Sequence, residues 1–180
     1  MYFAIRRVFD SMISLIALVV LSPILLAISI AIMIDSKGGV VFKQLRVGKN
    51  GKPYYMYKFR TMIPNAQNMG TGVYSFKGDP RITKVGRVIR ATRIDELPQI
   101  LNILKGDMSI VGPRPERKEN VVKYSETLPE FDFRLKVRGG LTGYAQIYGK
   151  YNTSAYDKLR LDMLYIENYS ILMDIRLILM

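Results

Sequence analysis

Residues 11–34 read SMISLIALVVLSPILLAISIAIMI, without one ionisable side chain, and lie between Asp10 and Asp35. As a straight helix that rises about 1.5 Å per residue, this stretch would reach ~36 Å, more than the ~30 Å hydrocarbon core of a bilayer. A secretory signal peptide has a shorter apolar core, roughly 7–15 residues, that ends at an A-x-A-like site, and no such site occurs here. We therefore expect a membrane helix.

The dipeptide Ser22-Pro23 lies at the middle of this apolar stretch. Proline removes a backbone donor and kinks a helix, which leaves two halves that are each too short to span a bilayer alone. The carbonyl that the proline frees needs a partner, and the Ser22 hydroxyl is placed to bond it locally. We expect Ser22 and Pro23 to form a kink.

Basic residues flank both ends of the stretch: Arg6 and Arg7 precede it, and it is followed by Lys37, Lys43, Arg46, Lys49 and Lys52. Because positive residues favour the cytoplasmic side, a simple span would leave one cluster on the wrong face. A bent, re-entrant helix with both ends at the cytoplasmic face satisfies both clusters. An ordinary kinked transmembrane anchor is the alternative, because prolines are common in such helices.

The composition narrows the chemistry of the rest of the chain. The 180 residues contain no cysteine and no histidine, which excludes a disulfide framework, a catalytic thiol, a Ser-His-Asp triad and an HExxH zinc site. The 27 Lys and Arg residues against 15 Asp and Glu residues give a formal net charge of +12. Such a charge indicates an anionic partner: nucleic acid, an anionic membrane surface or a phosphorylated substrate.

A β-hairpin is predicted after the apolar stretch. Residues 40–42 and 53–62 flank Gly48-Lys49-Asn50-Gly51, which contains an Asn-Gly turn signal. Alternation in the second strand places Lys58 and Arg60 on one face, where they could hold phosphate or form an ordinary solvated face. Residues 63–80 contain Asn, Gly, Ser and Pro without a helical or strand periodicity, and they are expected to form a mobile loop.

A cationic helix is expected from Asp79-Pro80 onward. Its inward residues would be Ile82, Val85 and Ile89, and basic residues recur at every third position: Arg81, Lys84, Arg87 and Arg90. This stripe could bind a diphosphate, a nucleic-acid backbone or lipid headgroups, or it could be a solvated helix face.

The pair Asp95-Glu96 follows, at the start of a predicted helix with Leu97, Ile100, Leu101 and Leu104 inward and Gly106 at its C-terminal end. One interpretation is an N-cap aspartate with an acidic first turn. The other is a phosphoryl-transfer site, in which one carboxylate attacks, both help to hold Mg²⁺, and Arg90 and Arg93 neutralise phosphate. Without histidine or cysteine, carboxylate chemistry is the main route left.

Two prolines enclose Arg114 in Gly112-Pro113-Arg114-Pro115 and hold it in an extended conformation, which suits a phosphate ligand or a rigid turn. Further on, residues 155–168 predict a helix with Tyr156, Leu159, Met163 and Ile166 on one face, and residues 171–180 are apolar except for Asp174 and Arg176. Both helices are too short to span a membrane and are expected at its interface, with ordinary core helices as the alternative.

These motifs together resemble the monotopic phosphoglycosyl transferases, the bacterial sugar transferase family. The resemblance covers nearly the whole chain. The stretch from residues 148–153 to residues 165–168 is more similar to the exopolysaccharide-priming branch. The residues that carry the resemblance are Ser22-Pro23, Tyr57-Lys58-Phe59-Arg60-Thr61-Met62, Asp95-Glu96-Leu97-Pro98-Gln99, Leu104-Lys105-Gly106-Asp107-Met108-Ser109, Val111-Gly112-Pro113-Arg114-Pro115 and Gly140-Leu141-Thr142-Gly143-Tyr144-Ala145-Gln146.

The resemblance implies the transfer of a sugar 1-phosphate from a UDP-sugar to undecaprenyl phosphate, with release of UMP. It implies Asp95 as the nucleophile of a phosphosugar-aspartyl intermediate, Glu96 as its partner in metal or proton handling, and Mg²⁺ held by both. The residues expected to bind the phosphates are Lys58, Arg60, Arg90 and Arg114. The location implied is the cytoplasmic face of the bacterial inner membrane, with no nucleic-acid partner and with a homo-oligomer left open.

The expected fold is α+β and helix-rich, a monotopic membrane protein with a re-entrant helix at residues 1–36 and a cytoplasmic catalytic body at residues 37–180. This body would contain a small β-hairpin and interfacial amphipathic helices. The alternative function is a membrane-anchored basic protein that binds nucleic acid or anionic lipid without catalysis, but it leaves Asp95 and Glu96 without a role.

Overall fold

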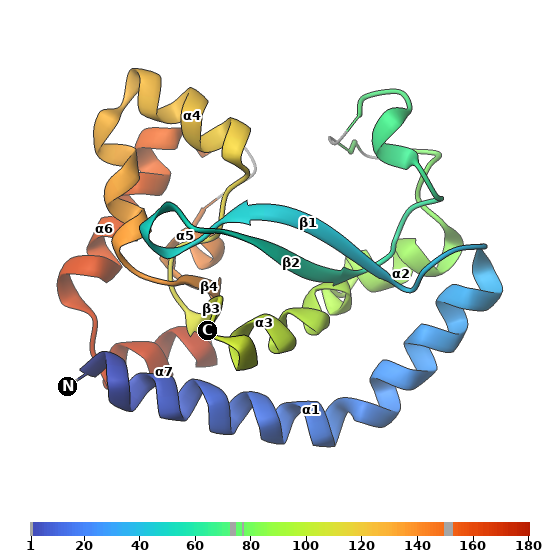
Figure 1. The fold of residues 1–180 in the computed structure, drawn as a ribbon, viewed down its shortest axis with the longest axis horizontal. Helices are drawn as coiled ribbons and strands as arrows, with labels where there is room; N and C mark the ends of the chain where they lie inside the picture. The colour runs from blue at the N-terminus through green and yellow to red at the C-terminus, as the bar shows by residue number, and fades with distance from the viewer. Residues whose placement is uncertain (1, 73–74, 77, 150–152) are drawn as a thin grey trace. The chain divides into compact units, whose positions relative to one another are not determined.

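The computed structural model describes residues 2–72, 75, 76, 78–149 and 153–180. Its helices and strands, in chain order, are α1 (Tyr2–Asp35), β1 (Val41–Val47), β2 (Pro53–Phe59), α2 (Lys84–Ala91), α3 (Ile100–Lys105), β3 (Met108–Val111), α4 (Lys118–Thr127), β4 (Gly139–Thr142), α5 (Tyr144–Ile147), α6 (Ala155–Asn168) and α7 (Ile171–Leu179) (Figure 1). Within the described ranges, these elements are joined by the 3₁₀ helices η1 (Lys49–Gly51), η2 (Ala66–Asn68), η3 (Ile94–Gln99) and η4 (Pro129–Lys136). The predicted helix-rich α+β class is confirmed.

The chain packs as two compact units. The first contains residues 1–15, 44–56 and 101–180, and the second contains residues 16–43 and 57–100. Helix α1 and both strands of the hairpin continue from one unit into the other, and η3 of the second unit leads directly into α3. This division by packing differs from the predicted division into a membrane helix and a body, which stays a prediction.

Helix α1 is long and apolar enough to cross a membrane by length and composition. Its most apolar 18-residue window has a mean hydropathy of 2.9, and only 6% of that window is buried in the protein. The helix is continuous through Pro23 and bends in its second half (Figure 1). Ser22 Oγ donates to the carbonyl of Val19, 2.7 Å away, which is the acceptor that Pro23 leaves without its usual donor. The predicted role of Ser22 is confirmed.

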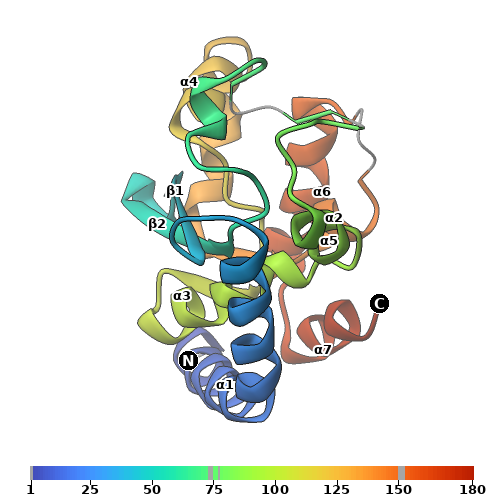
Figure 2. The ribbon, with the colours of Figure 1, turned by 90° about the vertical axis from the view of Figure 1, so that its right-hand side faces the viewer.

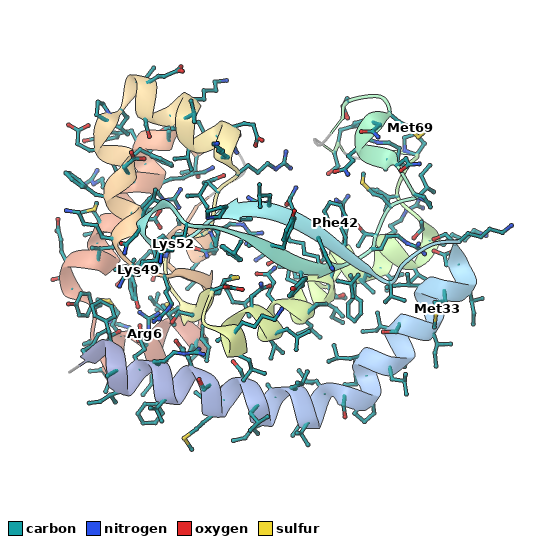
Figure 3. All side chains as sticks on the ribbon, viewed as in Figure 1. Arg6, Met33, Phe42, Lys49, Lys52 and Met69 are labelled. Carbon is teal, nitrogen blue, oxygen red and sulfur yellow. The ribbon has the colours of Figure 1, made fainter. Side chains whose placement is uncertain are left out.

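The N-terminal end of α1 is bound to β3, α3 and α7 of the first unit. Arg6 is 6% exposed, its Nε lies 3.3 Å from Asp174 Oδ2, and its Nη2 donates to the carbonyl of Val111. Figure 3 shows the Arg6 side chain pointing from α1 into the protein. Arg7 Nη2 donates to the carbonyl of Leu104 over 2.6 Å. Arg6 therefore neutralises a buried carboxylate, and Arg7 caps the end of α3. From the sequence alone, both residues are interpreted only as positive charges that flank the apolar stretch.

The C-terminal end of α1 is bound within the second unit. Arg60 is 8% exposed, and its guanidinium donates to the carbonyls of Ile32, Ser36 and Lys37 at 3.2, 2.6 and 2.8 Å. Helix ends leave such carbonyls without partners, so Arg60 caps α1 with a favourable charge. Asp35 Oδ2 accepts from the backbone nitrogen of Val85 in the first turn of α2, at 2.9 Å.

The strands of the described residues form two small sheets. Strands β1 and β2 form the predicted hairpin, with β2 ending at Phe59 rather than Met62. Strands β3 and β4 pair in parallel, with Met108 opposite Gly139 and Val111 opposite Thr142. The backbones of Gly112 and Gly140 come so close that a Cβ on Gly140 would lie 2.1 Å from the nitrogen of Gly112. This parallel pair was not predicted.

The predicted cationic helix is shorter than expected, and Arg81 does not belong to its stripe. Helix α2 begins only at Lys84, after the N-cap Thr83. Arg81 is 6% exposed, pairs with Asp79 at 2.6 Å and donates to the carbonyls of Ala66, Met69 and Gly72. Its charge therefore organises the segment predicted to be a loop without regular structure, which includes η2.

Helices α6 and α7 form at the predicted positions and follow one another closely (Figure 2). The buried face of α6 differs from the prediction. It consists of Leu159, Asp162 and Tyr165, whereas Tyr156 is 63% exposed. Asp162 is buried because it pairs with Arg134 at 2.7 Å. In α7, Asp174 is one of the two charged residues of an otherwise apolar segment, yet it faces inward. Leu172 and Leu179 are strongly exposed.

Gly86 tests the close packing of α2. A Cβ at this position would lie 2.1 Å from the backbone oxygen of Thr61, which cannot rotate away. We expect Gly86→Ala to lower the free energy of unfolding in detergent by about 1–3 kcal/mol. Gly39→Ala is the matched control, because nothing lies within 4 Å of its Cβ position. Equal stability of the two variants in denaturant titrations would contradict this packing.

Candidate functional site

Asp95 and Glu96 lie in the first turn of η3. The residue that precedes this helix is Arg93, whose φ of 57° places it in the left-handed region. For a residue with a side chain this conformation costs about 1–2 kcal/mol, and such strain concentrates at functional sites. Since Arg93 occupies the cap position, Asp95 is not the N-cap residue, which was the structural alternative for this motif.

Lys58 from the end of β2 reaches the carboxylate pair. Its Nζ lies 2.7 Å from Glu96 Oε1, and both side chains are largely buried, with 15% and 18% of their surface exposed. Arg90, in the last turn of α2, contributes a second positive charge that acts on Asp95. The structure thus brings together four of the predicted site residues within the second unit: Lys58, Arg90, Asp95 and Glu96.

The environment of Asp95 raises the pKa of its carboxyl group. Burial is the largest cause, and the neighbouring charge of Glu96 adds to it, while Lys58 and Arg90 oppose both. A carboxylate that is partly removed from water is more basic and holds its hydration shell less tightly, which favours attack on an electrophile. The arrangement therefore suits a nucleophile better than a surface carboxylate would.

The carboxylates of Asp95 and Glu96 could bind Mg²⁺ only together with ligands from water or the substrate. In the described ranges, no group of three or more acidic side chains is placed to hold a metal ion by itself. Magnesium sites in phosphoryl-transfer enzymes typically use one or two carboxylates and complete the coordination with water and substrate phosphates. Asp95 and Glu96 supply two carboxylates, which meets this requirement.

Arg114 belongs to the first unit, in the segment that connects β3 to α4. Its carbonyl accepts a hydrogen bond from Arg134 Nη2 at 2.9 Å, and the carbonyl of Pro115 accepts one from Arg46 Nη1 at the same distance. Gly112, just before this segment, has a φ of 150° and lies against the backbone of Arg138 and Gly140. Prolines and hydrogen bonds together hold the Arg114 backbone, as the sequence predicts.

Arg60 has a different role from the predicted one. Its guanidinium is buried and donates to the backbone carbonyls at the end of α1. Lys58, two residues earlier, binds Glu96 instead. Sequence reasoning also missed the roles of Arg6, Arg134 and Asp174. The lone carboxylate in the apolar segment 171–180 was a usable signal, because a charge there needs a buried partner.

Comparison with known proteins identifies the family. The family model described as bacterial sugar transferase matches residues 1–180, and the chain belongs to this family. It is 41% identical over 180 residues to the UDP-N-acetylgalactosamine-undecaprenyl-phosphate N-acetylgalactosaminephosphotransferase of Aeromonas hydrophila. It is 42% identical over 182 residues to the exopolysaccharide production protein PSS of Rhizobium leguminosarum bv. phaseoli, and 40% identical over 178 residues to the UDP-glucose:undecaprenyl-phosphate glucose-1-phosphate transferase of Klebsiella pneumoniae.

These relatives differ in length. The alignments cover 98%, 97% and 96% of this chain, but 42% of the Aeromonas protein, 91% of the Rhizobium protein and 38% of the Klebsiella protein. The chain thus spans less than half of two of these relatives. The predicted family is confirmed. The motif at residues 148–153, which was compared with the exopolysaccharide-priming branch, lies partly outside the described residues.

The charges around Asp95 predict opposite effects of two substitutions. Lys58→Met removes a cation that lowers the pKa of Asp95, so this pKa should rise, whereas Glu96→Gln removes an anion that raises it, so the pKa should fall. The titration of ¹³C-labelled aspartate carboxyl groups by NMR measures both shifts. Lys84→Met, an exposed cation on the same helix as Arg90, is the control and should have little effect. Shifts of the same sign in the first two variants would contradict the assigned geometry.

Proposed function

We propose that this protein transfers a sugar 1-phosphate from a UDP-sugar to undecaprenyl phosphate, which releases UMP and gives undecaprenyl-diphosphate-sugar, a priming step in exopolysaccharide or other glycoconjugate synthesis. The observation that carries the proposal is the partly buried Asp95, next to Glu96 and under the charge of Lys58 and Arg90, in a chain without histidine or cysteine. The names of the Aeromonas and Klebsiella relatives support the donor and acceptor classes.

The reaction proceeds in two displacements at one phosphorus. An oxygen of Asp95 attacks the phosphorus that carries the sugar, the bond from this phosphorus to the bridging oxygen of the diphosphate breaks, and UMP leaves with the electron pair. An oxygen of undecaprenyl phosphate then attacks the same phosphorus and displaces Asp95, which restores the carboxylate. The raised pKa of Asp95 makes it a stronger base and nucleophile than an ordinary aspartate.

The neighbouring side chains of the proposed site each have a defined task. Lys58 holds Glu96 and adds positive charge, and Arg90 binds phosphate oxygens. Arg114, which belongs to the first unit, stays a predicted phosphate ligand. Asp95 and Glu96 would hold Mg²⁺, which when bound neutralises charge on the diphosphate. Arg60 stabilises the end of α1 and is left out of the phosphate-binding set. The net charge and the cationic helix suggested the alternative of a non-catalytic basic binding protein, but membership in a transferase family does not support it.

We further propose that α1 is re-entrant, with the protein at the cytoplasmic face of the inner membrane. Both ends of α1 are bound to elements outside the apolar segment, Arg6 to β3 and α7 and Asp35 to α2. The 16 residues at 92–107 join α2 to β3, and five of them are charged: Arg93, Asp95, Glu96, Lys105 and Asp107. Charged side chains are costly to place in a hydrocarbon core, which favours both ends of α1 at one face. The exposed apolar residues of α7 favour contact with the same interface.

The kink of α1 has a direct test. Replacing Ser22 by alanine and Pro23 by leucine restores the backbone donor to the Val19 carbonyl and should straighten the helix toward a true span. We expect a tag at the N-terminus to become partly accessible from the periplasm of intact cells. Ser29→Ala is the matched control, because Ser29 also donates to a helix carbonyl but has no proline beside it. Identical protection of the tag in both variants would show that the kink does not set the topology.

The nucleophile is tested by turnover and by stoichiometry. Asp95→Asn should abolish UMP release while the protein still folds, because the amide nearly conserves the shape of the side chain, and Glu96→Gln should be severely impaired. Wild-type protein with Mg²⁺ and UDP-glucose or UDP-N-acetylgalactosamine, but without lipid, should release at most one equivalent of UMP per site in a burst. Direct attack by the lipid phosphate would give no burst, and a fully active Asp95→Asn variant would remove the proposed nucleophile.

A further inference from the structure

Two arginines from different elements donate to neighbouring carbonyls of the segment that contains Arg114. Arg134 comes from η4 and binds the carbonyl of Arg114, and Arg46 comes from β1 and binds the carbonyl of Pro115, each over 2.9 Å. All of these residues belong to the first unit. The two arginines make the same kind of backbone contact, but they differ in how their charge is balanced.

The charge of Arg134 is compensated within the protein. This residue is 4% exposed, its Nη2 lies 2.7 Å from Asp162 Oδ2, and its Nη1 lies 3.9 Å from Glu116 Oε1. A buried cation is normally stabilised by such carboxylate partners, since removal from water is otherwise costly. Two carboxylates therefore balance the charge of Arg134, although its Nη1 is buried without a hydrogen-bond acceptor.

The charge of Arg46 is not compensated in this way. Among the side chains that the structure describes, no carboxylate lies within 4.0 Å of its guanidinium, whose other contact is Gln44 Oε1 at 2.6 Å. Its Nε is buried without a hydrogen-bond acceptor. Burial lowers the pKa of Arg46 to about 10, and the positive charges of Arg117 and Arg114 act in the same direction, whereas Glu116 opposes them. The side chain is thus held in an environment that disfavours its charge.

Tyr54 on β2 supplies a second donor at the same place. Its hydroxyl is buried and has no hydrogen-bond partner. Burial raises the pKa of Tyr54, so the hydroxyl stays protonated and can donate, and the charges of Arg46 and Arg114 act on it. The ring lies against Gly48, where a Cβ would be 3.1 Å from a ring carbon. Gly48 lines a small hollow together with Val47, Pro113, Arg114 and Pro115.

The Arg46 Nε and the Tyr54 hydroxyl are two buried donors without an acceptor, and the positive charge of Arg114 acts on both residues. Burying such groups without partners costs free energy, and an anion with several oxygens is the ligand that can satisfy them together. We propose that Arg46 and Tyr54, next to Arg114, form a subsite that binds a phosphate group of the substrate. The identity of that substrate rests on the proposed function, where the phosphate belongs to the donor nucleotide or to the polyprenyl phosphate.

The test uses Tyr54→Phe in the full-length protein, with Tyr55→Phe, an exposed tyrosine on the same strand, as the matched control. Dissociation constants are measured for UMP and, separately, for undecaprenyl phosphate in detergent micelles. We expect Tyr54→Phe to weaken the binding of one of these ligands roughly tenfold or more, as for the loss of a hydrogen bond to a charged group, while Tyr55→Phe binds like wild type. The ligand affected identifies the source of the phosphate.

Thermal stability without ligand separates this role from a structural one. Because the Tyr54 hydroxyl has no partner to lose, Tyr54→Phe should unfold at the same temperature as wild type or higher. Arg46→Met should weaken the same ligand at least as strongly, although it also loses the bond to Pro115. Unchanged binding of both ligands by Tyr54→Phe, equal weakening in Tyr55→Phe, or no measurable binding by wild type would each overturn the subsite.

The outcomes also separate the subsite from the proposed function. If wild type releases UMP from a UDP-sugar but Tyr54→Phe binds both ligands normally, the subsite is wrong and the activity stands. If Tyr54→Phe loses phosphate binding but wild type releases no UMP from any UDP-sugar tested, the subsite stands and the proposed reaction is wrong.

Discussion

A buried guanidinium group holds each end of the long apolar helix. Arg6 joins the N-terminal end of α1 to Asp174 and to the carbonyl of Val111, and Arg60 caps the carbonyls at the C-terminal end. Breaking one partner of a buried, hydrogen-bonded charge pair typically costs about 3–5 kcal/mol, far more than a surface ion pair contributes. These contacts therefore constrain an otherwise exposed helix at two points, and the arrangement of the membrane segment depends on them.

The same elements that hold the C-terminal end of α1 also carry the candidate catalytic residues. Arg60 follows β2, where Lys58 binds Glu96, and Asp35 binds the start of α2, where Arg90 lies in the last turn. Their shared core consists of Ile32 of α1, Phe59 of β2 and Ile89 of α2, all at most 5% exposed. The carboxylates thus have a fixed relation to the C-terminal end of α1.

Local patterns predicted the parts of this structure that depend on neighbouring residues in the chain. The apolar run, the bond from Ser22 to the freed carbonyl, the hairpin, Gly106 as a helix end with a φ of 90°, and the last two helices follow from such patterns. The carboxylate pair was singled out because the absence of histidine and cysteine left few alternatives, and the structure places the charges of Lys58 and Arg90 near it. The catalytic role of these residues stays a prediction.

Pairings between residues that are distant in the sequence could not be predicted in the same way. Periodicity assigned Arg60 to a strand face and Arg81 to a helix stripe. It does not show that Arg60 caps α1, or that Arg81 binds Asp79 and the segment 66–72. The predicted apolar face of residues 155–168 did not include Asp162, although its partner Arg134 lies in η4 and makes it a buried residue. Buried ion pairs reverse the rule that charges face water, and a single sequence does not show the partner.

The measurement that tests this account most directly is the labelling of both ends of α1 in the wild-type sequence background. The chain has no cysteine, so a single cysteine in an N-terminal extension and a separate Lys37→Cys variant give unambiguous sites. A membrane-impermeant maleimide is applied to intact cells and, in parallel, to opened cells. If α1 is re-entrant and both of its ends lie at the cytoplasmic face, neither site reacts in intact cells and both react after opening. Reaction of only one of the two sites in intact cells would show that α1 spans the membrane and would contradict the account.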